Sequence, residues 1–274
     1  MQKFLIFIIA LSTSLLFQVI GLTGMPSTVR AADPPTLLIH EVADYFPDQT
    51  GNEWVYRGTM LEGGMVQIAD GRFTNVSKVM GMETIDGVVV TVFHDTNPGD
   101  QGPSDSYYRR DAAGIRYYGS KPGTTLERQL VPYQIVRFPL AIPSTFEQLN
   151  RRGLNLGMDL DRDGESESVD VLAVVTVHAQ ESIRVPAGVY PEAIKLEARM
   201  TMDVHLTESG TTIQGTDVMT AWFAKGVGLL KYVERQTIPS PRNQHERMVE
   251  VIEELEKFTP SFGKESPGGG KPSS

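Results

Sequence analysis

Residues 82–93 read Met82-Glu83-Thr84-Ile85-Asp86-Gly87-Val88-Val89-Val90-Thr91-Val92-Phe93, and this stretch decides the fold class. Asp-Gly favours a two-residue turn with positive φ angles, which match the twist of two antiparallel strands. The residues after the turn are β-branched or aromatic, a composition that favours strands. The stretch therefore predicts a β-hairpin.

Outward from this hairpin, short apolar runs alternate with Gly, Asp and Pro turns over most of the chain. Such a pattern predicts a mainly all-β fold, a curved antiparallel sheet or open half-barrel of about ten strands, because an open sheet of that size must curl or be covered. Residues 129–150 contain three prolines and are expected to be an irregular connection. Residues 245–258 are expected to form a strand that can finish as a short C-terminal helix. The other predicted strands are 54–56, 66–68, 73–76, 106–109, 115–118, 169–178, 193–205, 217–223 and 229–236.

The N-terminus reads as a secretory signal peptide over residues 1–31. Lys3 precedes an apolar stretch at 4–22, and Val29-Arg30-Ala31 fits cleavage after Ala31, with Ala32 as a competing site. An uncleaved anchor is the alternative, since the stretch approaches the ~20 residues that span a bilayer. The sequence thus predicts an exported protein, periplasmic or extracellular. The predicted organisation is an extended arm at 32–44, one β-rich domain at 45–258 and a disordered tail at 259–274.

Charge and composition narrow the range of functions that the chain can have. The net charge is −9 and the chain has no cysteine. An acidic surface is a poor partner for nucleic acid or anionic lipid, and a chain without cysteine has neither disulfides nor a thiol nucleophile. No segment after the signal is apolar enough to span a membrane. The serine-hydrolase, zinc-protease and phosphate-loop motifs are missing, so we expect no catalytic residues, no cofactor-binding motif and no enzyme.

One acidic segment, residues 159–170, has the spacing of a calcium loop. Asp-x-Asp-x-Asp-Gly supplies carboxylates at positions 1, 3 and 5 and a glycine for the sharp turn. The loop predicts a Ca²⁺ site that stabilises the fold. An acidic turn without an ion is the alternative. The β-branched run that follows, and an Asp at position 12, argue against an EF-hand. The predicted ligands are Asp159, Asp161, Asp163, Glu165 (through its backbone carbonyl), Glu167 and Asp170.

Four tyrosines, Tyr107, Tyr108, Tyr117 and Tyr118, are expected to face each other on paired strands. Adjacent tyrosines on a strand point to opposite faces, so half of them can share one surface. Cross-strand packing is the favoured interpretation, and an aromatic binding groove is the alternative.

Three further segments carry a family resemblance. They are Tyr45-Phe46-Pro47 with Gly51-Asn52-Glu53-Trp54-Val55-Tyr56, Val185-Pro186-Ala187-Gly188-Val189-Tyr190 with Ala193-Ile194-Lys195-Leu196, and Trp222-Phe223-Ala224-Lys225-Gly226-Val227-Gly228-Leu229-Leu230-Lys231. Together they resemble the TapB-like secreted bacterial β-rich proteins, a family of unknown function. The resemblance implies a curved antiparallel sheet in the cell envelope and no known reaction.

The sequence as a whole predicts a non-enzymatic cell-envelope or secreted binding or assembly module, stabilised by Ca²⁺, whose partner is a protein, glycan or lipid. The first alternative is a carrier that binds an amphiphile or lipid against an apolar concave sheet face. The second is a hydrolase using Asp161 and Glu167. It is disfavoured because carboxylates this close in a glycine turn suit metal binding better than acid–base catalysis across a substrate.

Overall fold

Antiparallel strands account for most of the residues that the computed structural model describes, namely 37–62, 71–96, 102–238 and 247–261. The predicted signal peptide, the predicted strand at 66–68, the start of the predicted arm and nearly all of the predicted tail lie outside these ranges. The elements are β1 (Leu37–Ile39), α1 (Val42–Tyr45), β2 (Glu53–Glu62), β3 (Arg72–Ile85), β4 (Val88–Asp95), β5 (Ser104–Asp111), β6 (Gly114–Lys121), α2 (Thr125–Leu130), β7 (Tyr133–Arg137), β8 (Leu140–Ile142), β9 (Ser144–Asn155), β10 (Ser168–Val177), β11 (Glu181–Val185), β12 (Gly188–His205), β13 (Thr212–Ala224), β14 (Gly228–Ile238) and β15 (Arg247–Thr259).

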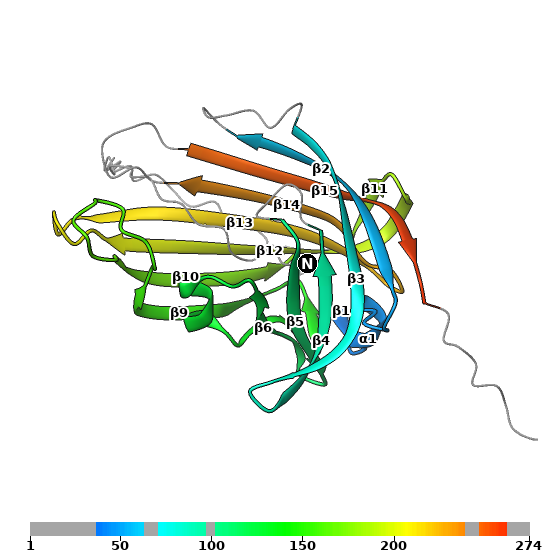
Figure 1. The fold of residues 1–274 in the computed structure, drawn as a ribbon. Coiled ribbons are helices and arrows are strands. Elements are labelled where there is room, and N and C mark those ends of the chain that lie inside the picture. Colours follow the sequence, from blue (N-terminus) through cyan, green and yellow to red (C-terminus); the bar gives the residue numbers. More distant parts are fainter. Residues whose placement is uncertain (1–36, 63–70, 97–101, 239–246, 262–274) are drawn as a thin grey trace, which may run out of the picture.

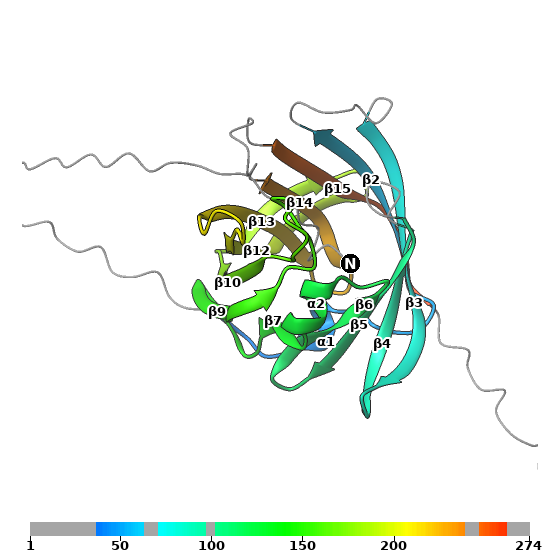
Figure 2. The ribbon, with the colours of Figure 1, turned by 60° about the vertical axis from the view of Figure 1, so that its left-hand side comes forward.

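One large sheet runs in the order β7-β6-β5-β4-β3-β2-β15-β14-β13-β12-β10-β9, with β11 paired to β12. All neighbouring strands in it are antiparallel. Figures 1 and 2 show the sheet curling around, from β9 through β12 and β15 to β3 and β6. The predicted curved antiparallel sheet is confirmed, and it curls further than a half-barrel, into a nearly closed, barrel-like sheet.

The hairpin that decides the fold class forms as the sequence predicts. Ile85 pairs with Val88 across the turn between β3 and β4. Asp86 and Gly87 both have positive φ angles, 50° and 79°, as the predicted turn requires. The turn residues and the strand pairing next to them therefore both form as the sequence predicts.

Alternation of buried and exposed side chains gives the barrel its core. On β10 the odd-numbered residues from Val169 to Val177 are buried, while Leu172 points outward and is 43% exposed. Because side chains on a strand alternate between faces, one face of each long strand fills the interior. The buried interior residues form one continuous apolar cluster.

Residues 129–150 differ from the predicted irregular connection. They include the end of α2, the short strands β7 and β8, and the start of β9. Prolines at 132, 139 and 143 separate these strands into runs too short to show a clear alternation, which is why the sequence pattern misses them.

The two ends of the described chain also differ in part from expectation. Within the predicted arm, β1 pairs with β8, and Val42–Tyr45 forms a helical turn instead of extended chain. At the other end, the strand expected over 245–258 is confirmed as β15 (Arg247–Thr259). A helix at its end is wrong, because β15 stays paired with β2 up to Thr259.

The two edges of the sheet, on β7 and β9, approach each other without a backbone ladder between them in the described residues. Side chains span this seam. Gln148 Nε2 donates to the carbonyl of Gln134 at 3.0 Å, and Arg137 donates to the carbonyl of Glu147 at 3.0 Å. Side-chain bonds therefore satisfy part of the edge that would otherwise present unpaired groups.

Helix α2 covers the continuation of this seam. Its Gln129 amide exchanges two hydrogen bonds with the backbone of Asn155 on β9, at 2.7 and 2.9 Å. Thr124 and Glu127 form a capping box at the helix start, which satisfies the first backbone N–H groups. A well-capped short helix thus holds the edge of β9.

Two of the segments that carry the family resemblance meet at one end of the barrel. Trp54 Nε1 donates to the carbonyl of Val227 at 2.7 Å, and the Tyr56 hydroxyl donates to the carbonyl of Leu229 at 3.1 Å. Trp54 also stacks on Phe258 with ring centres 5.0 Å apart. These contacts show that the segments hold β2 against the β13–β14 turn, a structural role.

Candidate functional site

The Asp-rich loop joins β9 to β10 and brings three of the six predicted ligands together. Carboxylate oxygens of Asp159, Asp161 and Glu167 all lie within 4.8 Å of one another. The flanking elements are both strands, as the residues after the loop predict. The loop is therefore a connection within a sheet and not an EF-hand.

Glu167 organises the loop from the inside. Its side chain is fully buried, and its carboxylate accepts the backbone N–H groups of Leu160 at 2.9 Å and Asp161 at 3.2 Å. Its own N–H donates to the carbonyl of Met158 at 3.1 Å. Hydrogen bonds to an ionised acceptor are stronger than neutral ones, so the first half of the loop is folded over this one side chain.

Asp159 fixes the turn that follows. Its two oxygens accept the N–H groups of Arg162 at 2.6 Å and Gly164 at 3.0 Å. Arg162 and Gly164 have φ angles of 71° and 95°, a backbone conformation that glycine adopts without strain. The positive φ angles and the two hydrogen bonds to Asp159 together curl the loop around its carboxylates.

Asp161 retains an oxygen without a protein partner. Its Oδ2 accepts the N–H of Glu208 at 2.9 Å, but Oδ1 is buried and has no hydrogen-bond partner in the described residues. A buried oxygen of this kind calls for a water or an ion. Three convergent carboxylates and this oxygen fit a hard cation such as Ca²⁺, which takes only oxygen ligands.

The other three predicted ligands lie outside this group. Asp163 and Glu165 are exposed, and the N–H of Glu165 donates to Asp163 at 2.8 Å, which lowers the pKa of the Asp163 carboxyl. Asp170 lies on β10, where it accepts the N–H of Gly153 at 2.8 Å. Because β10 already begins at Ser168, Asp170 belongs to the strand and lies outside the group of three loop carboxylates.

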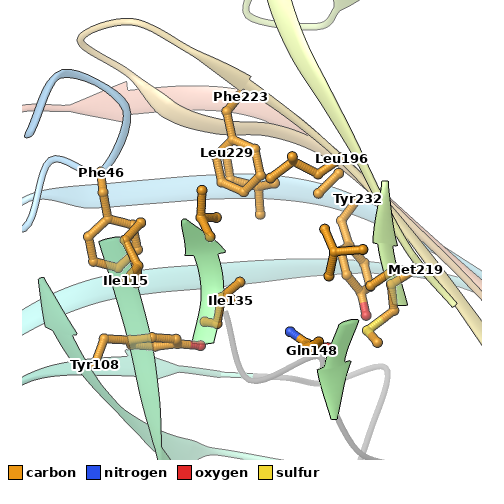
Figure 3. Close-up of a pocket in the computed structure, with 14 residues that line it drawn as sticks. Phe46, Tyr108, Ile115, Ile135, Gln148, Leu196, Met219, Phe223, Leu229 and Tyr232 are labelled. Atoms are coloured by element: carbon orange, nitrogen blue, oxygen red, sulfur yellow. The ribbon is translucent and has the colours of Figure 1, made fainter. Parts of the chain in front are cut away.

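A second candidate site is an apolar cavity inside the barrel, shown in Figure 3. Its volume is about 60 Å³, on a measure in which one water needs about 10–15 Å³. Gln148 is the only amide in a lining of aliphatic, aromatic and methionine side chains. The lining residues are Phe46, Tyr108, Ile115, Ile135, Val136, Gln148, Val175, Leu196, Ala198, Met219, Ala221, Phe223, Leu229 and Tyr232.

Two smaller voids share walls with this cavity. One of about 20 Å³ shares Ile115 and Leu196 with it, and one of about 10 Å³ shares Phe46 and Leu229. The interior therefore contains neighbouring apolar spaces that share lining side chains. Empty apolar space stays dry and favours an apolar guest.

The tyrosine cluster divides between two faces, as strand geometry predicts. Tyr108 and Tyr117 are buried in the interior with ring centres 5.3 Å apart. Tyr107 packs outside the barrel against Val90, Val92 and the partly buried Tyr118. Cross-strand packing explains most of the cluster, and Tyr108 also lines the cavity.

Buried acids lie beside the cavity. The Tyr232 hydroxyl donates to Glu234 at 2.8 Å, and Gln236 Nε2 donates to the other oxygen of Glu234 at 2.8 Å. Asp217 is 2% exposed and is the register partner of Gln236. Because these residues share the inward face of β13 and β14, Asp217 and Glu234 are diagonal neighbours.

Burial raises the pKa of Asp217 well above its ordinary value, and the charge of Glu234 and a hydrogen bond to it raise the pKa further. Two carboxyl groups this close in a dry site retain a proton between them. Burial raises the pKa of Tyr232 and Tyr133, and the nearby charge of Asp217 contributes to both shifts.

This raised pKa predicts a pH-dependent stability. The unfolded chain gives up the Asp217 proton near pH 3.8, whereas the folded chain holds it to a higher pH. The free energy of unfolding therefore falls as pH rises from that value through the raised pKa. Asp217→Asn is expected to flatten this fall and to be more stable than the wild type at neutral pH. Urea denaturation from pH 4 to pH 9 measures the free energy of unfolding of both proteins.

Asp203→Asn, on the outer face of β12, is the control. If the free energy of unfolding changes with pH in the same way in the wild type and in Asp217→Asn, the prediction is contradicted.

Comparison with protein-family models gave no match, and comparison with curated proteins gave none either. Two solved structures are similar in part. A candidate exported protein with a YmcC-like fold from Bacteroides fragilis is 14% identical, with 79% of this chain and 99% of that chain covered and a TM-score of 0.34. A candidate lipoprotein from Parabacteroides distasonis is 13% identical, with 78% and 98% covered and a TM-score of 0.31. Both TM-scores are too low to establish a shared fold or function.

Sequence reasoning found the loop but missed the buried acids. Tyr232, Glu234 and Gln236 stand two residues apart, so they share one face of a strand. A polar set at this spacing next to apolar strands is the signal that could have pointed to a polar interior. Asp217 gives no such signal alone, because its burial depends on the curl of the whole sheet.

Proposed function

We propose that the protein is a non-enzymatic binding protein of the cell envelope or extracellular space that holds an apolar molecule, or the apolar chain of an amphiphile, inside its barrel-like sheet. The apolar cavity carries this proposal. Ligand sites in β-barrels of this kind lie in the interior and use few polar groups. The cavity favours the carrier alternative over a module that acts only through its outer surface.

Two sequence features support the proposed location in the cell envelope or extracellular space. Residues 1–31 have the pattern of a secretory signal, and the three segments that resemble TapB-like proteins imply the cell envelope. Neither helix among the described residues has the length and apolar character needed to cross a bilayer. Membership of the TapB-like proteins is part of the proposal.

Binding of 1-octanol tests the proposal. Ala198 lines the cavity, and Ala198→Phe places a ring in the space that the octyl chain would occupy. We expect calorimetry to show saturable binding by the wild type and a loss of at least about tenfold in affinity, or 1.4 kcal/mol, in Ala198→Phe. Leu172→Phe, on the outer face of β10, is the matched control. Equal binding by wild type and a folded Ala198→Phe variant would contradict the proposal.

We further propose that Ca²⁺ binds the Asp-rich loop and stabilises the fold. Asp159, Asp161 and Glu167 would hold the ion, and the unpartnered oxygen of Asp161 is the observation that favours it. The ion would offset the repulsion among these carboxylates. Its role is structural, because the loop lies on the rim of the barrel, apart from the residues that line the cavity.

Calcium titration of the chelator-treated protein tests this second part. We expect saturable binding and a higher melting temperature, since about 2.7 kcal/mol is gained when the ion is present at 100 times its Kd. Asp161→Asn is expected to abolish both effects. Asp170→Asn should keep them, because Asp170 lies outside the carboxylate group. No heat and no thermal shift in the wild type would mean that the loop is an acidic turn without an ion.

A further inference from the structure

One residue of the cavity lining, Gln148, stands at a β-bulge on the edge strand β9. Glu147 pairs with Val174 of β10. The next residue of β10, Ala173, pairs with Leu149, so Gln148 is an extra residue between two register pairs. Bulges occur at sheet edges and beside active sites, where they re-aim a side chain. The bulge therefore explains how an amide comes to stand in an otherwise apolar wall.

The opposite edge of the seam, on β7, has a bulge of its own. Val136 pairs with Ile115 of β6. Gln134 pairs with the next residue of β6, so Ile135 is the extra residue. Ile135 also lines the cavity, and Figure 3 shows it with Gln148 among the lining side chains. Both edges of the seam therefore contribute a bulged residue to the wall of the same cavity.

The Gln148 amide has a fixed orientation. Its Nε2 atom donates to the carbonyl of Gln134 at 3.0 Å. Because a carbonyl oxygen only accepts hydrogen bonds, the nitrogen and not the oxygen of the amide must face it. The Oε1 atom is buried and has no hydrogen-bond partner in the residues that the structure describes. Buried acceptors normally have a partner, so this oxygen is an acceptor to which a ligand can donate.

We propose that Gln148 is the head-group anchor of the cavity and that its ligand is a neutral amphiphile, an apolar chain with a hydroxyl head group. The chain occupies the cavity, and the hydroxyl donates to Gln148 Oε1 at the seam. This inference rests on the proposed function, because it requires a guest inside the barrel. It adds the residue that selects the guest and the chemical class of its head group.

The chemistry of the wall favours a hydroxyl over a charged head group. A carboxylate only accepts hydrogen bonds, so it cannot pair with the Gln148 oxygen. An ammonium group donates, but moving its charge into a lining of aliphatic and aromatic side chains costs far more than moving a hydroxyl. A hydroxyl supplies the donor without a charge.

The experiment compares 1-octanol with its isomer 1-methoxyheptane by calorimetry, since the ether oxygen accepts hydrogen bonds but cannot donate one. We expect the wild type to bind octanol about three- to tenfold more tightly than the ether, the contribution of one hydrogen bond. Gln148→Met keeps the length of the side chain but removes the acceptor, so it should bind the two compounds equally. The two ligands are compared within each protein, so a change in stability from the lost Gln134 bond does not enter the ratio. Asn150→Met, at an exposed position of β9, is the matched control and should keep the octanol preference.

The outcomes separate the two proposals. If the wild type binds octanol and the ether equally, or if Gln148→Met keeps the octanol preference, the anchor is wrong and the cavity function stands. If neither compound binds the wild type, the cavity function is wrong and the anchor is wrong with it. An octanol preference that is lost in Gln148→Met and kept in Asn150→Met supports both. Gln148→Leu takes the place of Gln148→Met should that variant not fold.

Discussion

Glu167→Ala is expected to lower the free energy of unfolding by about 3 kcal/mol. The buried carboxylate accepts the N–H groups of Leu160 and Asp161, and each buried donor left without an acceptor costs about 1–3 kcal/mol. The lost side chain also leaves a cavity beneath the loop. Urea denaturation in the presence of a chelator measures the effect without any contribution from a bound ion.

Glu165→Ala is the matched control, since Glu165 belongs to the same loop and is exposed. Surface changes of this kind shift stability by only about 0.5 kcal/mol. If both variants unfold at the same urea concentration as the wild type, Glu167 does not organise the loop, and the geometry proposed for the ion loses its support.

Gly114→Ala is expected to destabilise the barrel by about 3–5 kcal/mol. Gly114 begins β6 with a φ angle of 134°, a conformation that costs other residues about 1–3 kcal/mol. A Cβ atom there would lie 1.9 Å from the carbonyl oxygen of Val136 on β7. Backbone atoms cannot yield as a flexible side chain does, so the clash would disturb the β6–β7 ladder and, through it, the seam.

Gly188→Ala separates the clash from the strained φ angle. Gly188 has a φ angle of 147°, but a Cβ there would meet nothing within 4 Å. We expect this variant to lose about 1 kcal/mol, the cost of the backbone conformation alone. Thermal unfolding of the two variants side by side measures the difference. A Gly114→Ala protein as stable as Gly188→Ala would show that β7 is not held closely against β6.

Much of the fold is predictable because it is encoded locally. The Asp86-Gly87 turn and the alternation on β10 each specify a strand pair from adjacent residues. The short strands between residues 129 and 150 are not predictable in this way, because prolines interrupt their alternation of buried and exposed residues. Closure of the barrel depends on Gln148 and Arg137 reaching carbonyls on the opposite edge, and no sequence pattern records which edges will meet.

The candidate sites likewise divide into one that is encoded locally and one that depends on the folded sheet. The spacing of Asp159 and Asp161 marks the loop, and Glu167, buried in the structure, belongs to the same segment. Asp170 lies outside the three-carboxylate group because β10 begins before it, at Ser168, a boundary that spacing alone does not show. Asp217 and Glu234 come from separate strands, so their pairing appears only once the sheet has curled.

The seam between β7 and β9 also determines how the barrel can deform. Elsewhere in the sheet, widening would break backbone ladders, whereas at the seam it breaks the side-chain bonds of Gln148, Arg137 and, on α2, Gln129. Each such bond contributes about 0.5–1.5 kcal/mol. The barrel is therefore mechanically weakest along one line, and under the proposed function a guest larger than the resting cavity would widen it there while every strand keeps its neighbours.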